Sequence, residues 1–213
     1  MEITDAPPFL FEALEFKPRK GDLKKLEIIK AAVDILATKG LDNATYEAIA
    51  QEIGTRRAHI AYHFSDKSDI FYAAVKYILA TYQNETALQL KGAESGEQML
   101  ERYVSSTFEW ARKNPHQVSV MLLLYYMCTT TERFIELNSE VRLAGKKRLI
   151  YLLSKLESPK LSSKKIDFLA PTIGDLISSA IVAATTQKDL ELEEMRLKTI
   201  KTVNALITSA ELE

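Results

Sequence analysis

The residues best suited to chemistry in this sequence lie between Thr45 and Lys67, in the segment TYEAIAQEIGTRRAHIAYHFSDK. Apolar residues repeat at helical spacing on both sides of Gly54, which predicts two short helices joined by a tight turn. The second helix has few side chains to bury, and it carries arginine, histidine and tyrosine side chains that can contact phosphates and base edges. A helix-turn-helix places its second helix in the DNA major groove, so this segment predicts DNA binding.

Charge at the start of the second helix supports that prediction. Arg56 and Arg57 oppose the helix dipole, which costs about 0.3–1 kcal/mol, and a polyanion facing them would explain the pair. Thr45 and Lys67 each begin a predicted helix, where free backbone N–H groups favour anions. A solvated arginine pair, a simple cap at Thr45 and a solvated charge at Lys67 are the alternatives. The candidate DNA-binding residues are Thr45, Tyr46, Thr55, Arg56, Arg57, His59, Tyr62, His63 and Lys67.

Other chemistries find little support in the sequence. His59 and His63 are four residues apart, as some metal ligands are, but the only other histidine is His116 and the only cysteine is Cys128. A structural zinc site needs four ligands, so we expect no metal site. The sequence has no glycine-rich phosphate loop and no nucleophile–base pattern of recognisable spacing. We therefore expect no enzyme activity and no cofactor, and we expect Cys128 to be a small buried hydrophobe.

Length and composition fit a soluble helical protein. The 213 residues are 46% hydrophobic and 27% charged, with a formal net charge of −1, so a basic surface for nucleic acid must be local. Only 7 glycines and 6 prolines argue for long helices. The N-terminus does not resemble a secretory signal, and the longest apolar run, residues 118–128, is shorter than the ~20 residues that span a bilayer. With one cysteine, these features predict a cytoplasmic protein without a membrane partner.

Periodicity predicts an all-α fold with about nine helices and no strands. The expected helices cover residues 22–38, 45–53, 55–64, 67–89, 98–112, 115–127, 132–156, 164–186 and 190–212. We expect an N-terminal arm over residues 1–20, either disordered or touching DNA, a three-helix helix-turn-helix domain over 21–67 and a larger helical domain over 68–213. The helix from Pro115 is apolar all round, which predicts that it is the centre of the second domain.

The order of residues in the N-terminal third resembles a known family. An alanine-rich inner helix face is followed in turn by Gly40, Thr45, Ile49-Ala50, Gly54, the run from Ile60 to Phe64, and Lys67. Over about residues 24–72 this order resembles the tetracycline-repressor (TetR) family of bacterial transcription regulators. The sequence departs from the family pattern at Ala61, where the family has tyrosine, and at Arg56, where it has a small N-capping serine. Thr55 could take over that cap, and Tyr62 could supply an aromatic phosphate contact.

The resemblance implies an effector pocket and a homodimer in the larger domain. Aromatic side chains with polar tips and adaptable methionines suit such a pocket, although core packing explains them as well. The ligand-pocket candidates are Tyr103, Phe108, Trp110, Met121, Tyr125 and Tyr126. The lack of a dominant buried charge favours an apolar or amphipathic effector. The dimer-interface candidates, which internal packing explains equally well, are Leu176, Ile177, Ala180, Ile181, Ile200, Val203 and Ile207.

By this resemblance we expect a homodimeric, ligand-responsive regulator, and a repressor in particular, which binds a pseudo-palindromic operator in double-stranded DNA. Effector binding would move the helix over 67–89 as a lever and change the separation of the two recognition helices. Two rivals stay open: a helical small-molecule-binding or protein-interaction module that has lost DNA binding, and a small helical enzyme that uses the aromatic pocket. Steep salt dependence of DNA binding tests the first rival, and a strongly shifted pKa in the pocket tests the second.

Overall fold

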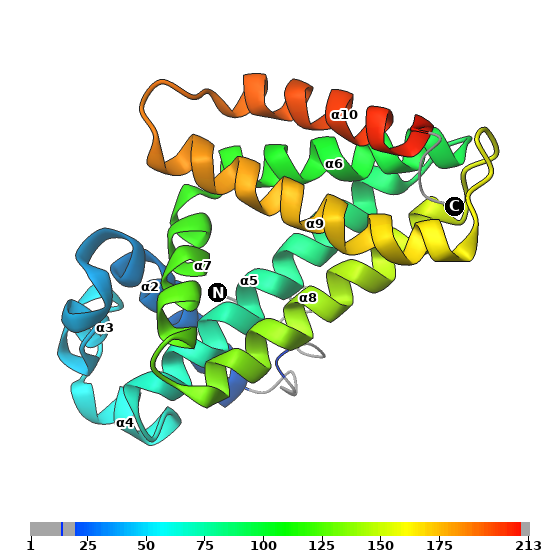
Figure 1. Ribbon diagram of the computed structural model, residues 1–213. Coiled ribbons are helices and arrows are strands. Elements are labelled where there is room, and N and C mark those ends of the chain that lie inside the picture. Colours follow the sequence, from blue (N-terminus) through cyan, green and yellow to red (C-terminus); the bar gives the residue numbers. More distant parts are fainter. Residues whose placement is uncertain (1–13, 15–19, 210–213) are drawn as a thin grey trace. The chain divides into compact units, whose positions relative to one another are not determined.

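A computed structural model describes Leu14 and residues 20–209, which form helices and connecting turns without a strand. The helices of this part are α2 (Lys20–Asn43), α3 (Tyr46–Glu52), α4 (Arg57–His63), α5 (Lys67–Leu90), α6 (Gly96–Lys113), α7 (Pro115–Cys128), α8 (Glu132–Leu153), α9 (Ser163–Thr186) and α10 (Leu192–Thr208) (Figure 1). The predicted all-α class is therefore confirmed. Apart from Leu14 and Lys20, the predicted N-terminal arm lies outside the described residues.

The chain divides into two compact units, each made of two separate stretches of sequence. Unit 1 comprises residues 1–84 and 114–138, and unit 2 comprises residues 85–113 and 139–213. The long helices α5 and α8 each contribute one end to each unit. This division differs from the predicted functional boundary after residue 67. That boundary stays a prediction, because compactness does not identify the residues that bind DNA or effector.

The core of unit 1 follows the predicted helical faces. On α2, Ile29, Ala32, Val33 and Leu36 are buried, as their spacing predicts. Gly40, with φ 77° and ψ 175°, interrupts the helix at the position where the sequence predicts its end. Unit 1 also buries Ile49 and Ala50 of α3, Ile60 of α4, and Ile70, Phe71, Ala74, Val75 and Ile78 of α5. Apolar burial of this kind, worth about 25 cal/mol per Å², holds the short helices in place.

The position of α7 corrects one expectation. This helix buries Val118, Val120 and Leu124 and packs against α2 within unit 1 (Figure 1). Tyr125 and Tyr126, near its end, are 40% and 60% exposed. The helix is therefore not the centre of the second domain. A segment that is apolar on all sides has no periodicity to identify its packing partner, so its composition could not assign it to either unit.

Helices α6, α9 and α10 pack against one another in unit 2 (Figure 1). The start of α6 also lies very close to the chain that follows α8. A Cβ atom added at Gly96 would overlap the carbonyl oxygen of Lys155. The Glu97 carboxylate accepts the backbone N–H of Glu157 at 3.1 Å, which ties the same two segments together. Glycine at position 96 is thus required by a close approach of two backbones.

Helix α9 has 24 residues, includes Pro171, and is long and apolar enough by length and composition to cross a membrane. The core helix of a soluble protein passes the same test, so one such helix is weak grounds for a membrane span. The inner face of α9 buries Leu169, Ala170, Ile173 and Ile177. Its packing against α6 and α10 accounts for this inner face, while only 28% of the apolar window is buried within the chain.

Helix ends agree less well with the sequence than helix positions do. The predicted starts at Pro115 and Glu132 are confirmed. Helix α8 ends at Leu153, before the predicted end at residue 156. Helix α10 ends at Thr208, before the predicted end at residue 212, because Ser209 is an extended C-cap with φ −62° and ψ 128°.

Candidate nucleic-acid interface

The helix-turn-helix forms where the sequence predicts it, with α3 and α4 packed against each other. Thr45 is the N-cap of α3, and its hydroxyl accepts the backbone N–H of Ala48 at 3.1 Å. Gly54 adopts φ 62°, a left-handed conformation that favours glycine and lets the chain turn. The backbone N–H of Thr55 donates to the carbonyl of Ala50 at 2.8 Å and closes the turn.

Helix α4 is exposed over most of its surface. Among its seven residues Ile60 alone is buried, and Phe64, which follows the helix, is buried as well. The exposed residues of this helix are Arg57, Ala58, His59, Ala61 and Tyr62. Tyr62 is 84% exposed. An isolated helix needs about 12–15 residues to be even marginally stable, so α4 depends on its two apolar anchors, and its outer face is free for another molecule.

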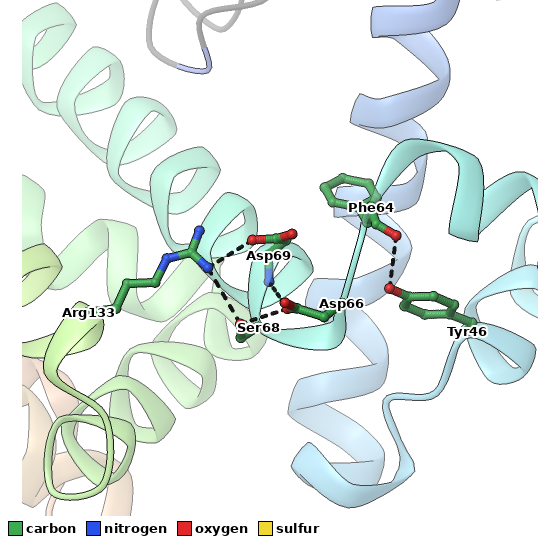
Figure 2. A network of polar contacts seen from close by, with 6 residues as sticks. All are labelled: Tyr46, Phe64, Asp66, Ser68, Asp69 and Arg133. Atoms are coloured by element: carbon green, nitrogen blue, oxygen red, sulfur yellow. Dashed lines mark hydrogen bonds and ion pairs between the residues drawn. The ribbon is translucent and has the colours of Figure 1, made fainter.

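Tyr46 joins the start of α3 to the end of α4. Its hydroxyl donates to the backbone carbonyl of Phe64 at 2.9 Å (Figure 2). The Arg57 guanidinium carbon lies 5.9 Å from the centroid of the Tyr46 ring, within reach of a cation–π contact. Burial raises the pKa of Tyr46, and the charges of Asp66 and Asp69 raise it further. Tyr46 thus has a clear structural role, and its contact with DNA stays a prediction.

The start of α4 differs from the hypothesis that Thr55 caps this helix. Arg56 is the N-cap residue and makes no side-chain capping bond. Thr55 does not take over the cap, because it precedes the N-cap position, and its hydroxyl lies 2.8 Å from Nδ1 of His59. This hydrogen bond holds the His59 ring at the exposed start of α4. The backbone N–H of His59 donates to the carbonyl of Arg56 at 2.9 Å, which completes the first turn.

His63 lies in the last turn of α4 and is half-buried. Its ring packs edge-to-face against Tyr62, with centroids 5.1 Å apart. Burial lowers the pKa of His63, and the positive charge of Lys25 lowers it further. The free chain therefore favours the neutral imidazole at this position, and a contact between His63 and DNA stays a prediction.

The start of α5 is capped by its own chain. The Asp66 carboxylate accepts the Ser68 hydroxyl at 2.7 Å and the backbone N–H of Asp69 at 2.9 Å. These two hydrogen bonds hold the pKa of Asp66 below its usual value. The ammonium of Lys67 donates to the carbonyl of Asp42 at 3.4 Å. Part of the anion-binding capacity expected at this helix start is thus occupied by Asp66, while Lys67 remains an exposed cation.

Arg133, which the sequence did not single out, contacts the same turn. Its Nη1 lies 2.8 Å from Oδ1 of Asp69 and 3.5 Å from Oγ of Ser68 (Figure 2). Its guanidinium carbon lies 4.6 Å from the centroid of the Tyr72 ring. Arg133 belongs to the first turn of α8 and is 64 residues from Asp69, so no local sequence pattern could have connected them.

The six ligand-pocket candidates belong to different units. Tyr103, Phe108 and Trp110 lie on α6 in unit 2 and are at most 8% exposed. Met121, Tyr125 and Tyr126 lie on α7 in unit 1. The α6 side chains therefore contribute to the core, which is the alternative that the sequence left open. A pocket that involves all six residues stays a prediction.

Most of the dimer-interface candidates face inward. Leu176 and Ile200 are half-buried. The other five, all buried within the single chain, are Ile177, Ala180, Ile181, Val203 and Ile207. Small and apolar residues mark an inner helix face as well as an interface, which is why the sequence could not separate the two roles. An interface on these helices would use outward residues such as Phe168 and Leu197, which are 49% and 55% exposed.

Cys128 and His116, the other titratable side chains considered from the sequence, each lie within hydrogen-bond distance of a partner. The Cys128 thiol donates to the carbonyl of Phe134 at 3.2 Å, and burial raises its pKa, which disfavours the reactive thiolate. Nδ1 of His116 lies 2.8 Å from Oδ1 of Asp34. Within the part of the chain that the structure describes, no three metal-ligating side chains gather in one place.

Comparison with known proteins gives a local sequence match. Residues 28–74 match the family of bacterial regulatory proteins called the tetR family. Over 75 residues, which are 35% of this chain and 33% of the relative, the sequence is 31% identical to the HTH-type transcriptional regulator HbdR of Aromatoleum sp. (strain CIB). The chain spans 33% to 47% of the length of the curated relatives it matches.

The fold as a whole is similar to solved structures. With a TM-score of 0.78 and 19% identity, the chain resembles a transcriptional regulator from Saccharomonospora viridis in complex with choline, over 86% of this chain and 96% of that one. With a TM-score of 0.77 and 18% identity, it resembles a TetR transcription regulator from Haloarcula marismortui ATCC 43049, over 86% and 98% of the two chains. At these identities the likeness shows the fold.

The matched segment includes the whole of α3 and α4, so this helix-turn-helix is of the kind that a class of bacterial DNA-binding regulators carries. The chain therefore carries the N-terminal helix-turn-helix segment of the TetR family of transcriptional regulators. The relative that shares this segment is named a transcriptional regulator, which agrees with the function class expected from the sequence.

Proposed function

We propose that the chain is a homodimeric repressor that binds a pseudo-palindromic operator in double-stranded DNA and is released by a small apolar or amphipathic effector. It would act in the cytoplasm. Helix α4 would enter the major groove, while Thr45 and Lys67 would contact phosphates on either side of it.

The exposure of α4 is the observation that carries this proposal. Arg57 and Ala61 are four residues apart on the helix, and so are Ala58 and Tyr62, so these four side chains share one exposed face. The two alanines add no bulk between Arg57 and Tyr62, which would let the α4 backbone approach base edges closely. Alanine can also contact the methyl group of thymine, and arginine can bind guanine. In this proposal Ala61, which departs from the family pattern, is part of the reading surface.

The effector part has support from the fold. A regulator of the same fold, from Saccharomonospora viridis, was solved in complex with choline. A small-molecule site in that protein supports the proposal that this chain also responds to a small molecule, of a class still to be found. The dimer part is supported by the exposed apolar side chains of α9 and α10, because a two-fold dimer buries one surface of each copy.

Substitution of the arginines tests the DNA-binding part. A duplex selected from a random library with the purified protein serves as the probe, and its affinity is measured by fluorescence anisotropy. Arg57→Ala should weaken binding by about 1–3 kcal/mol if the side chain reads a base. The matched control is Arg112→Ala, which removes an exposed arginine of unit 2 that is paired with Glu109. Unchanged affinity of both Arg56→Ala and Arg57→Ala at physiological salt would contradict the assignment of α4.

A further inference from the structure

A charge conflict lies beside the proposed DNA-binding surface. Lys67, the expected phosphate contact, is flanked in the same turn by Asp66 and Asp69. Two carboxylates next to a phosphate-binding lysine would repel the DNA backbone, because like charges brought together at an interface disfavour binding. Asp66 is needed as the cap of α5, where it accepts the backbone N–H of Asp69. Asp69, in the first turn of α5, has a charge that favours the helix dipole, but beside Lys67 the same charge would repel a phosphate unless another residue offsets it.

Arg133 is placed to offset that charge. Figure 2 shows its guanidinium reaching the Asp69 carboxylate and the Ser68 hydroxyl from the start of α8. The ring of Tyr72, 4.6 Å from the guanidinium carbon, provides a second contact. Arginine suits this position better than lysine, because a planar guanidinium can pack against a ring while it donates hydrogen bonds along its edge.

The backbone that carries Arg133 is well anchored. The next residue, Phe134, is fully buried and packs edge-to-face against Phe71 of α5, with ring centroids 5.2 Å apart and planes at 79°. The Arg133 side chain keeps 43% of its surface exposed, and that of Asp69 keeps 31%. The ion pair is therefore exposed enough for its net charge to act on a phosphate, and the buried Phe134 ring fixes its position.

We propose that Arg133 is a positioning residue for DNA binding, which cancels the charge of Asp69 beside Lys67 without touching DNA itself. The inference rests on the proposed DNA-binding function. Arg133 lies outside the segment over residues 28–74 that matches the family, so a residue of α8 completes the electrostatics of the DNA-binding surface.

The test uses the full chain and a fluorescein-labelled duplex of random sequence, since non-specific binding depends on phosphates rather than on bases. At ~50 mM salt, Arg133→Ala should bind about fivefold more weakly, as expected when one charge is left uncompensated about a Debye length from several phosphates. The double variant Arg133→Ala/Asp69→Asn should bind within about twofold of the wild type, because the uncompensated charge is gone. Asp69→Asn alone should bind at least as tightly as the wild type.

A matched control is available on the same helix. Arg142 forms an ion pair with Asp175, and Arg142→Ala should leave DNA binding unchanged. Thermal unfolding of every variant shows which of them fold. If Arg133→Ala does not fold, Asp69→Asn still decides, because weaker binding by that variant overturns the proposal. The proposal also fails if Arg133→Ala binds as the wild type does, if Asp69→Asn does not rescue it, or if Arg142→Ala is equally weakened. A wild-type chain that binds no duplex would instead overturn the proposed function itself.

Discussion

The Tyr46 hydroxyl joins the first helix of the helix-turn-helix to the residue that ends the second, through its 2.9 Å bond to the Phe64 carbonyl. Replacement of Tyr46 by phenylalanine removes this donor and keeps the ring. We expect the free energy of unfolding to fall by about 0.5–1.5 kcal/mol, measured by urea denaturation. Tyr62→Phe is the matched control, because the Tyr62 side chain is 84% exposed and its loss of a hydroxyl should leave stability unchanged. Equal effects in both variants would rule out a special role for Tyr46.

His63 gives unit 1 a dependence on pH. Its folded-state pKa is lowered by burial and then by Lys25, so the folded chain favours the neutral imidazole. The stability that this provides is fully present above the unfolded pKa of about 6.5 and is lost as the pH falls through the lower, folded pKa. Urea midpoints between pH 7.5 and pH 5 should therefore fall more steeply for the wild type than for His63→Gln. Parallel curves for the two proteins would show that His63 titrates as it does in the unfolded chain.

At the scale of the helices, the contact between the start of α6 and the chain after α8 leaves no room for a side chain. Gly96→Ala would place a methyl group in steric overlap with the Lys155 carbonyl oxygen, so the backbone must move. We expect a loss of stability of about 1–3 kcal/mol, the usual effect of overpacking. Gly145→Ala is the control, because no atom lies within 4 Å of its added methyl group and alanine favours a helix. That variant should be unchanged or more stable by up to about 1 kcal/mol in chemical denaturation.

Some elements could be predicted from the sequence because their causes are local. Thr45 caps α3, Pro115 begins α7 and Gly54 makes the turn, since each residue acts on backbone within four positions of itself. The inner face of α2 followed from its periodicity for the same reason.

Other features depend on contacts between distant parts of the chain. Arg133 and Asp69 meet across 64 residues, and neither has a neighbour in the sequence that marks it as paired. On α9 and α10, apolar spacing identified which side chains avoid water, but it could not tell whether their own chain or a partner covers them. Ile177 and Val203 are buried within one chain, so their own chain covers them.

For the whole molecule, the formal net charge of −1 means that any attraction to DNA must come from a local surface. If about 6–10 phosphates are contacted, affinity for the selected duplex should fall by about 10³–10⁵ between ~50 and ~200 mM salt. A chain that binds no duplex at low salt would favour the rival in which a helical binding module has lost its DNA contacts.

Light scattering should give twice the chain mass of 24.0 kDa for the proposed dimer.

The packing of α7 against α2 has a consequence for anyone who wishes to dissect or recombine this protein. Unit 1 is assembled from residues 1–84 and residues 114–138, with a stretch of unit 2 between them. A fragment cut after residue 67 would expose the surface of α2 that α7 covers, and Asp34 would lose His116 as its partner. A chimera that takes its DNA-binding region from a relative should therefore include α7 of that relative as well as its helix-turn-helix. A graft that ends at the limit of the sequence match, residue 74, would leave the transplanted α2 facing a foreign α7.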